Sequence, residues 1–251
     1  QGTVIYTLYY QGVAADGSVV LNQSQNLNSV DFYLTDQTLS VGDAIPAYSA
    51  TNYILCFAAG TRIATPSGEM KVENLRAGDV IRTADSATTT VRWLGRQTIA
   101  TLFADEVHAC PIRISAGALA AGVPSRDLLV TGDHGLVFGE AIVHASALVN
   151  GTTITRVAKA DLASTVTYYH IETEGHAVVL AEGTPAETFI DNAGREKFDN
   201  FAEFVAMYGA EQDDIEPLTL PRAKSAREVP AALKARIAVR VAQFFTAAHV
   251  A

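Results

Sequence analysis

The chain has 251 residues, of which 49% are hydrophobic and 18% are charged, and its formal net charge is −9. This composition supports one large or two small folded domains and excludes a wholly disordered chain. An acidic chain without a basic stripe is a poor match for nucleic acid, and no apolar run reaches the roughly 18–20 residues that a membrane span requires. Two cysteines, Cys56 and Cys110, are too few for a disulfide framework.

Residues 1–55 predict a short β-rich leader. The segments 4–10 and 30–34 are rich in β-branched and aromatic side chains, which is typical of strands.

Residues 56–192 contain many short strand signals separated by Gly, Pro, Asp and Asn. This spacing predicts an all-β domain with many tight turns. The predicted strands are 71–73, 79–83, 90–94, 127–130, 135–138, 165–173 and 177–180.

The character of the sequence changes at residue 193, and a helical extension is predicted over 193–251. Residues 199–207 are amphipathic, and residues 229–246 carry apolar side chains at helical spacing. Pro230 favours the first position of the second helix. We expect this helix to pack on the β domain or to bind a protein partner.

The most informative residue is Cys56, which opens the segment CFAAGTRIATPSG at 56–68 and precedes ENLRAGDVI at 73–81. As a thiolate, Cys56 can attack the carbonyl on its own amino side and form a thioester at the Leu55–Cys56 bond. The alternative is a buried cysteine that serves only as a small apolar side chain.

A second block reads LVTGDHGL at 129–136. Thr131 and His134, three residues apart across a tight turn, can face one carbon atom. An imidazole can donate a proton to an amide nitrogen near neutral pH, and a threonine hydroxyl can hold the scissile amide off-planar. The pattern T-x-x-H is common by chance, so its weight comes from its place between two β-like segments, 78 residues (134 − 56) after the cysteine. The alternatives are a turn histidine and a strand-end hydroxyl without a role.

A third block, YYHIETEGHAVVLAEG at 168–183, completes a pattern that resembles the Hint domain family. These domains are the self-processing modules of inteins, hedgehog C-terminal domains and bacterial intein-like proteins. The resemblance covers residues 54–192 and is strongest for the bacterial subfamily. It implies a flat, horseshoe-like disc of twisted strands built from two related halves, with Cys56 in its central cleft.

The resemblance also implies roles for individual side chains. Cys56 would be the nucleophile, His134 the general acid, and Thr131 the group that orients or strains the amide. His170 stands where inteins often carry a residue that assists proton transfer, and it would do the same or bind a strand carbonyl. His176 would be catalytic or structural. No cofactor is implied, and without a C-x-x-C pair, zinc on Cys56, His134 and His176 would inhibit rather than serve.

The chain departs from two branches of the family. Glu187 and Thr188 stand where splicing inteins end in His-Asn. Thr188 has no side-chain amide to cyclise, so intein-type splicing is not supported. Hedgehog proteins place an Asp near Gly95 to activate a sterol, so a sterol acceptor is not supported either.

The expected function is therefore self-cleavage by an N–S acyl shift at Leu55–Cys56. The thioester would be resolved by water or by a small external amine or thiol, and the chain's own amino-terminal segment would be the substrate. Two alternatives stay open: a non-catalytic β scaffold with a permanently docked leader, and an intermolecular cysteine peptidase. Because bacterial modules of this kind often belong to secreted proteins, export or a cell-surface location is favoured over the cytoplasm.

Overall fold

The computed structural model describes residues 9–14, 19–22, 32–34, 48–50, 55–101, 106–188, 194–209 and 215–248. The chain divides into two compact units, residues 1–52 and 53–251.

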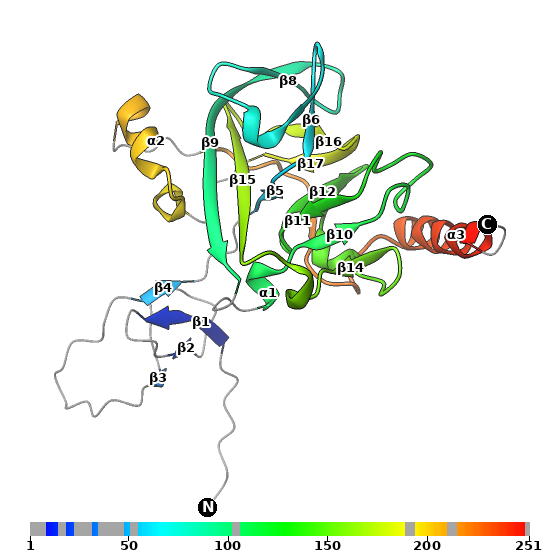
Figure 1. Ribbon diagram of the computed structural model, residues 1–251. Coiled ribbons are helices and arrows are strands. Elements are labelled where there is room, and N and C mark those ends of the chain that lie inside the picture. The colour runs from blue at the N-terminus through cyan, green and yellow to red at the C-terminus, as the bar shows by residue number, and fades with distance from the viewer. Residues whose placement is uncertain are drawn as a thin grey trace, which may run out of the picture. The chain divides into compact units, whose positions relative to one another are not determined.

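The first unit is a four-stranded antiparallel sheet with the order β3-β2-β1-β4 (Figure 1). The strand predicted at 30–34 contains β3. The strand predicted at 4–10 overlaps the start of β1, and its residues 4–8 lie outside the described residues. The described residues of the first unit all lie in strands, as expected for a β-rich segment. Its strands are β1 Tyr9–Ala14, β2 Val19–Asn22, β3 Phe32–Leu34 and β4 Tyr48–Ala50.

The second unit contains two seven-stranded sheets, of which the first has the order β14-β10-β11-β5-β15-β9-β8. The long strands β9 and β15 pair antiparallel from Thr165↔Ala100 to Thr173↔Val91 and run side by side in Figure 1. The strands of this sheet are β5 Phe57–Ala58, β8 Val80–Arg82, β9 Thr88–Ala100, β10 Ile112–Ile114, β11 Leu128–Val130, β14 Ile154–Arg156 and β15 Thr165–Thr173.

The second sheet has the order β18-β13-β12-β17-β16-β6-β7. Its neighbours pair antiparallel, except that the short β18 runs parallel to β13. The strands are β6 Arg62–Thr65, β7 Gly68–Lys71, β12 Gly135–Phe138, β13 Ala141–His144, β16 Val178–Ala181, β17 Thr184–Glu187 and β18 Arg222–Ala223.

The predicted all-β class is confirmed, and within residues 55–188 each predicted strand but one overlaps an observed strand for most of its length. The exception is 71–73, because β7 ends at Lys71 and residues Val72–Asn74 form a 3₁₀ turn. Val72 and Leu75 are both fully buried, and their spacing of three places them on the same side of such a turn. The burial of this pair therefore outweighs the strand preference of the segment.

Apolar side chains from both sheets form one main buried cluster, which includes Phe57, Ile63, Ile112 and Val179. A second, smaller cluster contains Cys56, Ala58, Trp93, Tyr168, Phe198 and Phe204. Successive side chains of a strand point to opposite faces. Phe57 of β5 therefore enters the main cluster, while its neighbours Cys56 and Ala58 enter the second.

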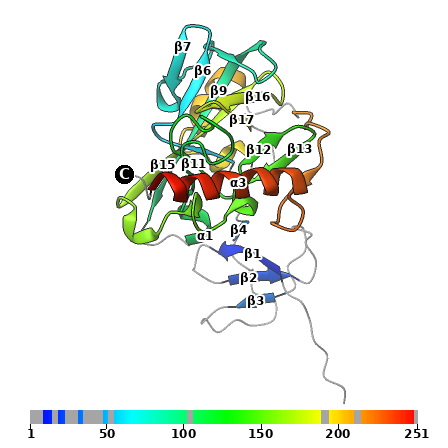
Figure 2. The same ribbon diagram turned by 90° about the vertical axis from the view of Figure 1, so that its right-hand side faces the viewer.

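The carboxyl-terminal extension contains two predicted helices, which form as α2 Phe201–Tyr208 and α3 Ala231–Ala248. A short helix, α1 Glu106–Ala109, precedes β10. Pro230 is not the first residue of α3 but its cap, since its carbonyl accepts the backbone N–H of Lys234. Figure 2 looks onto α3, whose Leu233 and Ile237 are buried in the main cluster. The helix thus packs on the β unit. Within the described part of the chain, no helix is both long and apolar enough to cross a membrane.

Candidate functional site

Cys56 directly precedes β5, a strand of two residues that pairs on one side with β11 and on the other with β15. This central place in the sheet buries Cys56 completely, with 0% of its surface exposed. Burial raises the pKa of the Cys56 thiol well above its ordinary value, because the thiolate would lose its hydration. The resting side chain is therefore a neutral thiol.

Thr131 holds the backbone of Cys56 from the end of the neighbouring strand. The Cys56 amide N–H donates to Thr131 Oγ1 at 2.9 Å, and the Thr131 amide N–H donates to the Cys56 carbonyl at 3.0 Å. These two bonds continue the β5–β11 pairing past its last residues. The nitrogen of the Leu55–Cys56 bond is thus bound by the hydroxyl group that the sequence pattern indicated.

His134 follows Thr131 across a turn closed by a bond from the His134 N–H to the Thr131 carbonyl, 3.1 Å long. The ring is fully buried and packs on Phe57, with 4.2 Å between the ring centroids. Burial lowers the pKa of His134 to about 4, and the charge of Glu187 and the backbone of Glu187 and Leu55 partly offset this. At neutral pH the imidazole is therefore uncharged.

The backbone of Leu55 favours the protonated form of His134. Such an interaction is one in which the ring donates, so the Leu55 carbonyl is its acceptor. In the resting geometry, however, neither ring nitrogen makes a hydrogen bond of ordinary geometry with a described residue. The ring therefore lies close enough to the Leu55 backbone to be influenced by it, without a hydrogen bond of ordinary geometry to it.

His170, on β15, lies beside the thiol, with its Nδ1 atom 3.7 Å from Cys56 Sγ. Burial lowers the pKa of His170 well below its ordinary value, and the neighbouring His134 adds to this effect. The pair therefore consists of a neutral thiol and an uncharged imidazole that can accept a proton.

His176 lies beside Glu187. Its Nδ1 accepts the backbone N–H of Leu218 at 2.9 Å, and its Nε2 is 3.1 Å from Glu187 Oε2. Because Nδ1 is an acceptor, the proton of the neutral ring is on Nε2, which is close to the carboxylate but does not make a hydrogen bond of ordinary geometry with it. Of the histidines named from the sequence, His170 contacts Cys56 directly, whereas His176 supports Glu187.

The sequence model of the Hint domain matches residues 55–193, which is more than half of the chain. The chain belongs to the Hint domain family. Membership of this family indicates self-processing chemistry in general. No curated protein matches the chain.

Similar solved structures include two inteins and an intein-like domain. A variant of the MchDnaB-1 intein is 14% identical, with a TM-score of 0.38 over 53% of this chain and 99% of its own. The gp41-1 intein is 11% identical, with a TM-score of 0.38 over 52% and 96%. The bacterial intein-like domain from Clostridium thermocellum is 18% identical, with a TM-score of 0.37 over 54% and 99%.

Glu187 and Arg222, the second of which lies outside the matched residues, are the residues near this site that sequence reasoning missed. Glu187 was recognised only as a departure from the intein pattern. Its carboxylate is fully buried and accepts two bonds from Arg222, at 2.9 and 2.7 Å. Burial alone would raise the pKa of Glu187, but interactions with His176 and Arg222 lower it to about 2. One signal was present, since Gly135 follows His134 and a Cβ atom there would collide with this carboxylate.

Gly95, near the position where hedgehog proteins carry an Asp, is covered by the ring of Phe198. Gly95 pairs with His170 across β9 and β15. A Cβ atom at Gly95 would lie 2.8 Å from the ring of Phe198, which comes from the extension beyond the matched residues. The Phe198 ring also meets Trp93 edge-on at 5.4 Å. Phe198 thus closes one side of the space around Cys56 and His170.

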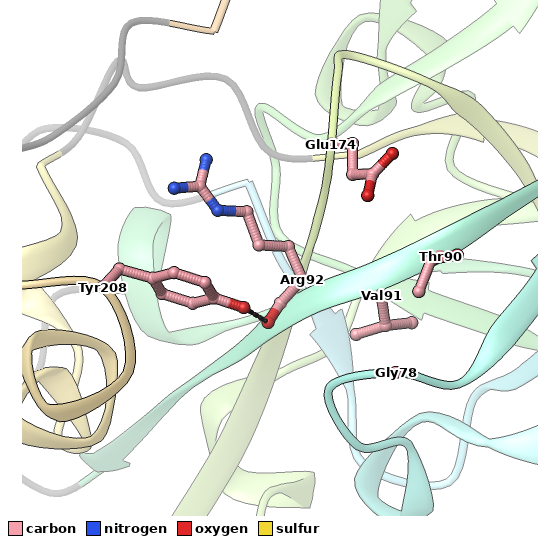
Figure 3. Close-up of a pocket in the computed structure, with 6 residues that line it drawn as sticks. All are labelled: Gly78, Thr90, Val91, Arg92, Glu174 and Tyr208. Atoms are coloured by element: carbon pink, nitrogen blue, oxygen red, sulfur yellow. Dashed lines mark hydrogen bonds between the residues drawn. The ribbon is translucent and has the colours of Figure 1, made fainter.

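A surface pocket of about 440 Å³ lies elsewhere, beside α2 (Figure 3). The Tyr208 hydroxyl donates to the Arg92 carbonyl at 2.7 Å, and the Arg92 guanidinium lies 4.6 Å from the Tyr208 ring centroid. None of the candidate site residues lines this pocket. Its lining residues are Gly78, Thr90, Val91, Arg92, Glu174 and Tyr208.

Cys56 and Cys110 are both buried, and no disulfide joins them. Over the described ranges, no group of three or more His, Cys, Asp or Glu side chains is arranged to hold a metal ion.

Proposed function

We propose that this Hint domain cleaves its own chain at Leu55–Cys56 by an N–S acyl shift. The resulting thioester is resolved by water or by an external amine or thiol. One observation carries the proposal: a hydroxyl binds the backbone nitrogen of Cys56 while an imidazole lies beside the thiol of the same residue. Thr131 binds the amide nitrogen at 2.9 Å, and His170 lies 3.7 Å from the thiol sulfur.

The first step forms a bond between Cys56 Sγ and the carbonyl carbon of Leu55. The thiol proton moves to Nδ1 of His170, the base beside it. Burial disfavours both the thiolate and the imidazolium, so this transfer is uphill in the closed site. The intact precursor is therefore expected to react slowly until the site opens or a stronger nucleophile is supplied.

The second step breaks the carbon–nitrogen bond, and the nitrogen of Cys56 takes up one proton. The acyl shift consumes no protons overall, because the thiol loses one and the amine gains one. With a pKa of about 4, only about one His134 ring in a thousand is protonated near pH 7. His134 therefore acts as an acid only after it has received a proton during the reaction, and the proton that the Cys56 thiol loses balances the one that the amine gains.

The third step decides the fate of the leader. Attack by water on the thioester leaves a carboxylic acid on Leu55 and a free thiol on Cys56. Attack by an amine leaves an amide, and attack by a small thiol leaves a new thioester that water then hydrolyses. Glu187 and Thr188 provide no amide for cyclisation, so the carboxyl-side cleavage of splicing inteins is not part of this proposal.

A non-catalytic scaffold is the second candidate, and the closed site favours it. Cys56 is fully buried, its thiol pKa is raised, and Phe198 covers the space beside His170. The catalytic proposal is preferred because a scaffold does not require Thr131 and His170 to meet on the same residue.

The decisive experiment follows the intact mass of the purified full chain near neutral pH, with and without dithiothreitol. Cys110→Ala is the matched control, since Cys110 is the other buried cysteine. The wild type and Cys110→Ala should split between Leu55 and Cys56, faster with thiol, and Cys56→Ala should stay whole. If the wild type and Cys110→Ala both stay whole for days in the presence of thiol, spontaneous self-cleavage is excluded and the scaffold becomes the preferred function.

A further inference from the structure

A buried ionic network adjoins the proposed site. Glu187, at the end of β17, is fully buried, and both its oxygens accept bonds from Arg222 at 2.9 and 2.7 Å. His176 Nε2 approaches one of these oxygens at 3.1 Å and is itself fixed by the Leu218 amide. Placing an ion pair in the interior costs solvation, so the network does not follow from stability alone.

The network lies directly against the turn that carries His134. Strands β12 and β17 pair at Leu136↔Ala186, so the residues before Leu136 and after Ala186 are neighbours. Gly135 has no side chain, and the Glu187 carboxylate occupies the space where one would project. The next residue back along the chain is His134.

Arg222 reaches this place from outside the residues that match the Hint domain. It begins β18, which runs parallel to β13 with Ile142 opposite Arg222. The Ile142 amide donates to the Pro221 carbonyl at 2.9 Å and fixes the start of the strand. The segment between α2 and α3 thereby places the Arg222 guanidinium beside Glu187.

We propose that Glu187 is a positioning residue for the cleavage, because its buried carboxylate stabilises the imidazolium of His134 as the nitrogen of Cys56 is protonated. Arg222 keeps Glu187 ionised and in place, so the carboxyl-terminal extension is part of the reaction centre. This inference rests on the proposed function. It explains how a ring in an apolar site can carry a proton at all, since a nearby anion lowers the cost of the cation.

The charges that face the two rings support this role. Glu187 favours the protonated form of both His134 and His170. His144, on β13, opposes protonation of His134. Protonation of His170 is opposed by His134, His176 and Arg195. Glu187 therefore provides the attraction that counters several cationic or potentially cationic groups.

The first test is a histidine NMR titration of the full chain, with Cys56→Ala as background so that the chain stays whole. The variant is the neutral pair Glu187→Gln with Arg222→Gln, which avoids leaving one buried charge without its partner. The His134 midpoint should fall by roughly one pKa unit, the size expected for loss of a neighbouring charge. An unchanged midpoint overturns the inference.

The matched control is the pair Glu182→Gln with Arg126→Gln. Glu182 is also a buried carboxylate on the same sheet unit, 3% exposed, and binds Arg126 at 3.0 Å. It should leave the His134 midpoint where it is. An equal fall in both double variants would show a general loss of packing and overturn the specific role of Glu187.

The second test measures thiol-induced cleavage with Cys56 present and folding checked by circular dichroism. The neutral pair should cleave about 10- to 100-fold more slowly, which is less than the roughly 10²–10⁴-fold of a group that itself transfers the proton, because Glu187 acts through His134. Glu187→Asp and Arg222→Lys, which keep the charges, should recover part of the rate. A wild type that never cleaves overturns the proposed function and this inference with it. A folded neutral pair that cleaves at the wild-type rate overturns the inference alone.

Discussion

Thr131→Val tests whether the Thr131 hydroxyl assists the reaction by binding the amide of Cys56, because valine has almost the same shape as threonine. The substitution removes the hydroxyl that accepts the Cys56 N–H at 2.9 Å and leaves this buried donor without its partner. An unsatisfied buried donor costs about 1–3 kcal/mol of folding stability. As the nitrogen becomes protonated, the lost bond changes from a neutral bond worth about 1 kcal/mol to a charge-assisted bond worth about 1.5–3 kcal/mol. The difference, about 0.5–2 kcal/mol, predicts cleavage about 2- to 30-fold slower.

The assay for Thr131→Val is the intact mass of the chain over time in dithiothreitol, with urea unfolding measured in parallel. Thr131→Ser keeps the hydroxyl and is the matched control, expected to cleave within about threefold of the wild type. If Thr131→Val cleaves as fast as Thr131→Ser while still folded, the hydroxyl does not act on the amide and the reasoning is wrong.

Three further predictions concern the surroundings of the site. Phe198→Ala should uncover the thiol, so that Cys56 reacts with iodoacetamide at least about tenfold faster; an unchanged labelling rate would show that Phe198 is not the cover. The lowered His134 pKa means that the unfolded chain binds more protons below about pH 6.5, so stability is lost as the pH falls toward about 4. In urea unfolding, His134 should account for about 2 kcal/mol of the stability lost between about pH 7 and about pH 4.5, beside the contribution of His170, so His134→Gln should lose about 2 kcal/mol less over this range. Arg195→Met should destabilise the fold by about 3–5 kcal/mol, because it leaves the fully buried Glu172 without its closest cation; adding Glu172→Gln should restore most of the loss, as measured by thermal unfolding.

Local patterns were sufficient for the strands, because each strand shows its side-chain alternation or its apolar run within a few residues. Segment 165–173 illustrates this, since the predicted bounds are those of β15. Segment 71–73 shows the limit, because the burial of Val72 and Leu75 depends on packing that no local propensity describes. The meeting of Cys56 with Thr131 was also within reach, because it follows from two blocks that are adjacent in the family's fold.

The network around Glu187 could not be derived in the same way. Arg222 is 35 residues from Glu187, on a two-residue strand with no periodicity of its own. A pairing of this kind depends on the path of a connecting segment, and charged residues in such segments are usually solvated. Gly135 was the one local sign that a side chain occupies this space, and a glycine after a histidine in a turn is not by itself evidence of a buried carboxylate.

The segment that carries Phe198 also finishes the edge of β9. Asn200 accepts the Arg96 amide at 2.8 Å and donates to the Leu94 carbonyl at 2.9 Å, and Asp199 accepts the Thr98 amide at 2.8 Å. Unpaired strand edges invite pairing with other chains. A chain shortened at residue 193 would expose this edge, so it should associate edge to edge and precipitate where the full chain stays dispersed. The same few residues thus protect the edge of β9 and close one side of the space around Cys56.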